Sequence, residues 1–198
     1  MPTPGQICSA CAAQLSPAPD SVLATGQSVI GAFTHDATAR RLVHVLKYRG
    51  VTAAAEPIAI ELAPRIPAST TALVPVPRAA SRSIRYGIDP AAALAAAVSR
   101  RTGLPVVAAL AAPLWWRRHA GAGRSDRTPI RFRQRLPIRA GTALIDDVVT
   151  TGATVAAASD ALGGVPALVL AATVARRVAA DDEYNGTPFW DAGTMPDA

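Results

Sequence analysis

Two adjacent carboxylates, Asp146 and Asp147, precede a short loop of small and hydroxyl-bearing residues, Thr150-Thr151-Gly152-Ala153-Thr154. Carboxylates accept hydrogen bonds, so this pair suits the vicinal hydroxyls of a sugar. The loop offers hydroxyl and backbone N–H donors, and the alanine-rich run after it predicts a helix whose N-terminus attracts a phosphate. Gly152 has no Cβ, so a phosphate can approach the backbone closely there. The pattern therefore predicts a site for a phosphorylated sugar.

Two other interpretations of this segment have to be weighed. A surface turn with an aspartate cap before a helix needs no ligand, and it stays as an alternative. A P-loop nucleotide triphosphatase also has acids at the end of a strand, but it requires G-x-x-x-x-G-K-[ST] upstream. The only lysine of the chain is Lys47, in Leu46-Lys47-Tyr48-Arg49, which excludes the P-loop interpretation.

The elements that would position this motif alternate between short apolar runs and helical stretches, which predicts a mostly parallel sheet flanked by helices. We expect the acid pair to follow the carboxyl end of its strand, the edge at which open α/β sheets bind ligands. Adjacent side chains of an extended chain point to opposite faces, so both acids reach one sugar only where the chain turns. The expected strands are 29–33, 72–74, 106–114, 143–145 and 166–174, with a hairpin arm in 132–138. The expected helices are 38–47, 52–63 (disturbed by Pro57), 91–101 (started by Asp89-Pro90) and the run after Gly152.

Length and composition predict one α/β domain at 28–178, a leader of little regular structure at 1–27 and a disordered acidic tail at 179–198. The net charge is +6, and residues 181–198 hold five acids and no base, which leaves +11 for the rest. This positive charge on the rest of the chain suits a polyanionic ligand, either a pyrophosphate or a nucleic acid. No apolar run could span a bilayer and no signal peptide is evident, so we expect a cytoplasmic protein without membrane contact.

Eight arginines between Arg117 and Arg139 face a single acid, Asp126, and form the densest run of charge. A solvated surface is the common explanation of such a run. A mobile lid over pyrophosphate and a contact to nucleic acid are the alternatives, and Trp115 and Trp116 beside it could stack on bases.

Cys8 and Cys11 have the C-x-x-C spacing that forms half of a four-ligand zinc site. No second cysteine pair exists, and His35, His44 and His119 lack ligand-like spacing, so we expect no zinc. A zinc ion shared across a homodimer is the alternative. A redox role of the thioredoxin type would need the motif after a strand, whereas this leader is polar and rich in proline.

Residues 142–154 closely resemble the phosphoribosyl pyrophosphate (PRPP) motif of type I phosphoribosyltransferases: a strand, two acids and a T-T-G-x-T loop. Other stretches resemble the ComF-type members of that family, so that the resemblance covers residues 7–178. They are His44–Gly50, Leu73–Pro77 with Arg82, Arg85 and Gly87, and Thr173–Arg177. The resemblance implies the type I phosphoribosyltransferase (PRTase) fold. It also makes Cys8 and Cys11 the remnant of a four-cysteine zinc module.

The resemblance assigns roles to individual residues. Asp146 and Asp147 would be the catalytic carboxylates that hold the ribose hydroxyls. Pyrophosphate would lie near Arg78, Ala79 and Lys47, although Lys47 equally suits the cation that caps a helix C-terminus. The whole PRPP site would comprise Asp146, Asp147, Val148, Val149, Thr150, Thr151, Gly152, Ala153 and Thr154. With Mg²⁺ as cofactor, the phosphoribosyl group would pass to a nucleobase or another amine.

Besides the missing second cysteine pair, the chain departs from the ComF pattern at two places. Ile88-Asp89 replaces Phe-Asn, and Trp115-Trp116-Arg117-Arg118-His119 stands where the family has a mobile Q…R…N loop. Ligand binding without turnover is therefore the second hypothesis. On that view the protein is a ComF-like accessory factor of DNA uptake in competence, which binds DNA or a helicase-like partner. A homodimer is left open.

Overall fold

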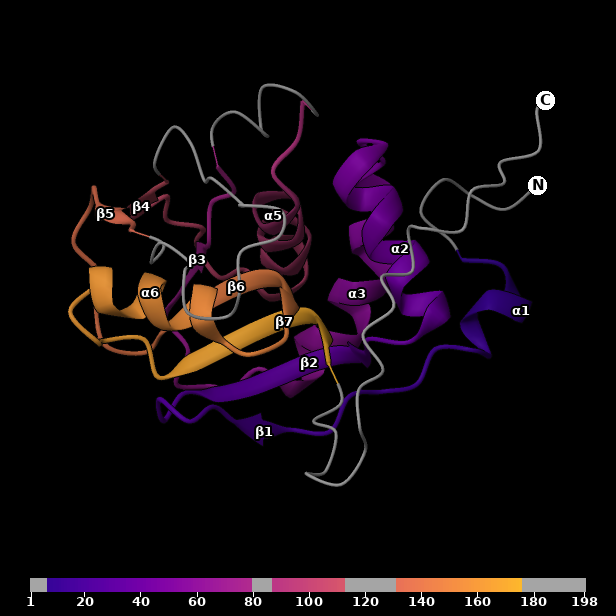
Figure 1. Ribbon diagram of the computed structural model, residues 1–198, viewed down its shortest axis with the longest axis horizontal. Coiled ribbons are helices and arrows are strands. Elements are labelled where there is room, and N and C mark those ends of the chain that lie inside the picture. Colours follow the sequence, from indigo (N-terminus) through magenta and orange to yellow (C-terminus); the bar gives the residue numbers. More distant parts are fainter. Residues whose placement is uncertain (1–6, 80–86, 113–130, 176–198) are drawn as a thin grey trace, which may run out of the picture.

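A computed structural model describes residues 7–79, 87–112 and 131–175 (Figure 1). Within these residues a five-stranded sheet has the order β1-β2-β7-β6-β3. Four strands are parallel, and β1 is antiparallel to β2 at the edge. The bounds are β1 (Ser21–Val22), β2 (Ser28–Thr34), β3 (Ala72–Pro75), β6 (Thr142–Val149) and β7 (Leu168–Val174). The predicted α/β class, with a mostly parallel sheet flanked by helices, is confirmed.

Helices cover both faces of the sheet. On one face lie α2 (Ala37–Tyr48), α3 (Ala55–Leu62) and α5 (Pro90–Thr102), whose apolar side chains pack against Ile145 and Leu170. On the other face α6 (Ala153–Ala161) packs against Leu144 and Val169. A short antiparallel hairpin of β4 (Leu110–Ala111) and β5 (Arg133–Gln134) adds to this second face, which confirms the hairpin arm expected in 132–138.

Local signals in the sequence explain where the long helices begin and end. The Asp36 carboxylate accepts a hydrogen bond from Ala39 N at 2.9 Å and caps α2. Asp89 caps α5 in the same way, and Pro90 occupies the first helical position, where no N–H is needed. Gly103, with φ +74°, ends α5 in the left-handed conformation that glycine adopts without strain.

The structure corrects three expectations about elements. Pro57 does not disturb its helix, because it lies in the first turn of α3, where an N–H has no intrahelical partner. The strand expected over 106–114 is reduced to β4 and an isolated bridge between Val106 and Leu73 within the described residues, because Leu110 and Ala111 pair with β5 and not with the main sheet. Strand β6 is longer than 143–145, since Val148 and Val149 continue its pairing with β7.

The N-terminal segment is more ordered than a leader of little regular structure. It contains a short helix, α1 (Ser9–Ala12), and the edge strand β1. Ala18 and Leu23 are buried, and the Arg65 guanidinium donates to the carbonyl oxygens of Gly31 at 2.7 Å and of Ala18 at 3.1 Å. This arginine therefore fastens the segment to β2.

Several expectations fall on residues outside the described part: the loop at 115–129, the two tryptophans, half of the arginine run and the acidic tail. Among the helices that the structure does describe, none combines the length and the apolar character needed to cross a bilayer.

Candidate functional site

The sheet topology marks one place for a ligand. Strands β3 and β6 are parallel neighbours, yet β3 leads to α5 on one face and β6 leads to α6 on the other. In open α/β sheets, ligands bind at the carboxyl ends of two such strands. The chain leaves the two strands toward opposite faces of the sheet, and this leaves a crevice between the two connections. The chain after β3 stays beside β6, since Val76 N donates to Ile145 O at 2.8 Å. Arg78 and Ala79 therefore lie next to the strand that carries the acid pair.

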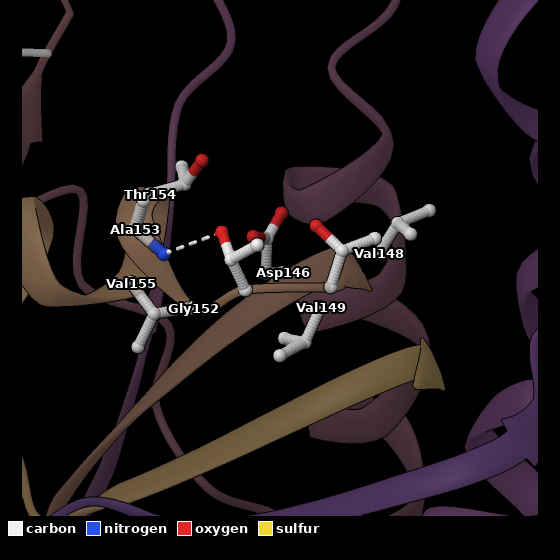
Figure 2. Close-up of a pocket in the computed structure, with 9 residues that line it drawn as sticks. Asp146, Val148, Val149, Gly152, Ala153, Thr154 and Val155 are labelled. Carbon is white, nitrogen blue, oxygen red and sulfur yellow. Dashed lines mark hydrogen bonds between the residues drawn. The ribbon is translucent and has the colours of Figure 1, made fainter. Parts of the chain in front are cut away.

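Asp146 and Asp147 lie within β6 and not after its end, which corrects the expected position. The strand runs on to Val149, so the backbone is extended at both acids and their side chains point to opposite faces. Both are buried, with 8% and 7% of their surfaces exposed. The Asp146 carboxylate accepts a hydrogen bond from Asp147 N at 2.8 Å and faces the loop before α6 (Figure 2).

Asp147 points to the opposite side, toward the end of α2. There the Lys47 ammonium lies 3.0 Å from Asp147 Oδ1 and 2.9 Å from Oδ2, so one cation contacts both carboxylate oxygens. Lys47 was expected either beside pyrophosphate or as a cap of its own helix. Lys47 does lie in the last turn of α2, as the second expectation has it, and Arg78 also caps this helix end, because its Nη1 donates to Lys47 O at 3.0 Å and to Ile88 O at 3.1 Å.

Arg78 is held from several sides. Its backbone N–H donates to Asp89 Oδ2 at 3.0 Å, and its guanidinium lies 5.9 Å from the centre of the Tyr48 ring. Asp89 thus links the turn after β3 to the start of α5, which it also caps. The two carboxylate oxygens of Asp89 share these tasks, because Oδ2 accepts from Arg78 N and Oδ1 accepts from Ala91 N at 3.1 Å.

A small open depression lies beyond Asp146 (Figure 2). It is formed by the loop and the first turn of α6, where backbone N–H groups have no intrahelical partner. Thr150, Thr151 and Ala153 are exposed, whereas the Val149 and Val155 side chains point away from it into the core. The predicted loop residues thus do line one depression together with Asp146 and Val148.

Gly152 has a structural reason to be glycine. Its φ is +78°, and a Cβ there would lie 2.8 Å from both methyl carbons of Leu23, a residue of the N-terminal segment. The close approach expected of a phosphate is therefore not needed to explain this glycine. The loop rests instead on a leucine that sequence reasoning placed in a leader.

Burial, followed by repulsion from Asp147, raises the pKa of Asp146 to about 8, although Lys47 opposes the shift. At neutral pH Asp146 is therefore mostly protonated, whereas the carboxyl group of Asp147 contacts the Lys47 ammonium. The two acids differ in role: one is a hydrogen-bonding group that faces the loop, and the other is a charge that faces α2.

This raised pKa predicts a pH-dependent stability. From about pH 4 to about pH 8 the folded protein binds a proton at Asp146 that the unfolded chain does not, so stability falls as the pH rises through this window and is level above it. Asp146→Asn mimics the protonated acid and still accepts from Asp147 N. As the pH rises through this window, urea unfolding should show that the free energy of unfolding of the variant increases relative to that of the wild type. The relative increase is at most about 1.4 kcal/mol per pH unit. Parallel pH curves for the two proteins would contradict this.

His35 and Thr173 belong to the same edge and were missed as a pair. His35 follows β2. Its ring atom Nδ1 lies 2.8 Å from Thr173 Oγ1 at the end of β7, and its backbone N–H donates to Val174 O. Burial and then the cations Arg40 and Lys47 lower the pKa of His35, while Asp147 raises it. The available signal was a histidine that follows an expected strand after one intervening residue, Thr34.

The described residues contain no group of three or more histidine, cysteine or acidic side chains placed to hold a metal ion. A single carboxylate, that of Asp147, fits Mg²⁺, which takes one or two protein carboxylates together with water and phosphate oxygens. At the other end of the chain, Cys8 and Cys11 are exposed free thiols, and Cys8 Sγ accepts from Cys11 N at 3.4 Å.

Comparison with models of known protein families finds no match to this sequence, and comparison with curated proteins finds no match either.

Proposed function

We propose that the protein binds PRPP with magnesium and transfers the phosphoribosyl group to a nitrogen nucleophile such as a nucleobase. The observation that carries this proposal is the placement of the acid pair. Asp146 and Asp147 lie at the switch point between β3 and β6, and the strand that holds them runs directly into a hydroxyl-rich loop and the N-terminus of α6. This arrangement puts one acceptor for a ribose hydroxyl, Asp146, beside the donors for a 5′-phosphate, with Asp147 on the opposite face of the same strand.

Each part of the site has a distinct task in this proposal. The loop and the first N–H groups of α6 bind the 5′-phosphate, and Asp146 lies between them and the sugar. Asp147 supplies the negative charge near C1 of the ribose. The turn after β3, with Arg78 and Ala79, borders the space for the diphosphate. The type I PRTase fold is part of this proposal, and the parallel order of β2, β7, β6 and β3 is compatible with it.

The reaction exchanges one bond for another at C1. The lone pair of the nitrogen nucleophile forms the new C1–N bond, and the C1–O bond breaks so that its electron pair leaves with pyrophosphate. Positive charge develops on the ribose ring as the bond breaks, and a fixed carboxylate nearby lowers the barrier without reorganising. Bound Mg²⁺, which Asp147 and the diphosphate oxygens would hold, supplies charge neutralisation for the leaving group.

Calorimetric titration of PRPP into the protein tests this function. We expect saturable binding that requires Mg²⁺, and weaker binding of ribose 5-phosphate through the loop alone. Release of pyrophosphate in the presence of a panel of nucleobases and amines would then identify the acceptor. If neither PRPP nor ribose 5-phosphate binds at millimolar concentration, the proposal is wrong.

The second hypothesis, an accessory factor for DNA uptake, stays a prediction. It depends largely on the arginine run, of which Arg131, Arg133, Arg135 and Arg139 fall within the described residues. None of these four has a resolved contact to the acid pair, and no structural feature described above favours DNA over a smaller polyanion.

A further inference from the structure

The Lys47–Asp147 ion pair uses the same carboxylate oxygens that a ligand would need. The ammonium lies within 3.0 Å of both oxygens of Asp147, and the Asp147 side chain is only 10% exposed. A ribose hydroxyl or a magnesium ion that binds this carboxylate therefore competes with the ammonium for the same two oxygens. In the free protein the site therefore contains its own cation.

The lysine is anchored at its backbone and open at its side chain. Arg78 holds the Lys47 carbonyl oxygen at 3.0 Å, which fixes the end of α2 against the turn after β3. The Lys47 side chain itself is 25% exposed, so it has a path out of the pair toward solvent. Four rotatable bonds let the ammonium move while the helix stays in place.

The structure also indicates where the displaced ammonium goes. Lys47 contacts both parts of the proposed site, Asp147 through its ammonium and Arg78 through its carbonyl oxygen. The proposed function puts the diphosphate beside Arg78 and Ala79. An ammonium that leaves a buried carboxylate needs another anionic partner, because an unpaired charge in a partly buried place is unfavourable. A diphosphate oxygen supplies that partner.

We propose that Lys47 is a built-in counter-ion, which a divalent cation replaces at Asp147 when a diphosphate ester enters, and whose ammonium then pairs with the diphosphate. This inference rests on the proposed function and specifies its order of events. Magnesium alone competes with Lys47 and binds weakly, whereas magnesium that arrives with the diphosphate gives the ammonium a new partner. The site thereby selects the metal complex of its ligand over the free metal.

Magnesium titrations in the absence of any organic ligand test the exchange. In Lys47→Met the carboxylate has no competing cation, and we expect Mg²⁺ to bind roughly 10-fold more tightly or better, measured by calorimetry and by the Mg²⁺-dependent rise in melting temperature. Arg49→Met is the matched control. Arg49 is exposed at the same helix end, and its replacement removes the same positive charge from the protein. This control should behave like the wild type.

A second variant keeps the test decisive if Lys47→Met folds poorly. Lys47→Gln retains a hydrogen bond to Asp147 and should gain Mg²⁺ affinity to a smaller extent, and restoration of folding by Mg²⁺ in either variant would count in favour. At saturating Mg²⁺, both variants should bind PRPP more weakly than the wild type, since the diphosphate loses a cation. Equal Mg²⁺ affinity in wild type, Lys47→Met and Lys47→Gln would overturn the inference.

The two proposals fail in different ways. If Lys47→Met gains Mg²⁺ affinity but no protein binds PRPP, the counter-ion stands and the phosphoribosyl function is wrong. If the wild type binds PRPP while the Lys47 variants match it in both titrations, the function stands and the counter-ion is wrong.

Discussion

Replacing Asp147 by asparagine is expected to weaken binding of PRPP with magnesium and to lower the rate of pyrophosphate release by on the order of 100-fold, the scale on which preorganised polar groups act in catalysis. The amide has nearly the shape of the carboxylate but no charge, so it neither attracts the cation nor stabilises positive charge on the ribose. Calorimetry gives the affinity, and pyrophosphate release gives the rate where an acceptor is known.

Two matched variants define what this loss means. Asp160→Asn removes one negative charge from an exposed position on α6 and should leave binding unchanged. Asp146→Asn should have a much smaller effect than Asp147→Asn near neutral pH, because the pKa of Asp146 is about 8 and its carboxyl is already mostly protonated. Equal losses in the two site variants would contradict the division of roles between these acids.

The second large effect is expected at the loop. In Gly152→Ala the new Cβ meets Leu23 at 2.8 Å and the residue keeps a φ of +78°, so both crowding and backbone strain arise. We expect the free energy of unfolding to fall by about 2–3 kcal/mol and the affinity for ribose 5-phosphate to fall with it. Denaturant unfolding and calorimetry measure the two quantities.

The chain offers controls that separate crowding from strain. Gly163 has a φ of +70° and open space around its Cβ position, so Gly163→Ala reports the strain alone, about 1 kcal/mol. Leu23→Ala removes the crowding atoms at the expense of a buried side chain. The double variant Leu23→Ala with Gly152→Ala should therefore be more stable than the sum of the single effects predicts, by about 1 kcal/mol. Strict additivity would show that the contact with Leu23 is unimportant.

Periodicity and capping signals in the sequence predicted the main elements of the fold. Asp89-Pro90 marked the start of α5, and the apolar runs around 29–33 and 166–174 marked β2 and β7. The limits of β6 could not be predicted in the same way, because acids are poor strand formers and only the pairing of β6 with β7 extends the strand through Asp146 and Asp147. Tertiary pairing therefore overrode the local preference at the motif itself.

The site was predictable where one segment carries it and unpredictable where several segments meet. Residues 146–154 are contiguous, so their order could be read directly. The pairing of Lys47 with Asp147 joins α2 to β6, and the hydrogen bond of Arg78 to Lys47 joins the turn after β3 to α2. Such contacts depend on how helices pack on the sheet, which no local pattern specifies. His35 and Thr173 escaped notice for the same reason.

Leu23 gives the N-terminal segment a mechanical role in the site. Leu23 packs against Gly152, so the N-terminal segment supports the loop from the side of the core. Arg65 in turn holds this segment against β2, because it donates to the carbonyl oxygens of Ala18 and Gly31. The stiffness of the loop then depends on how firmly that segment is fastened. Any event that loosens the segment, such as proteolytic cleavage near Asp20, would soften the loop without touching a single residue of the motif.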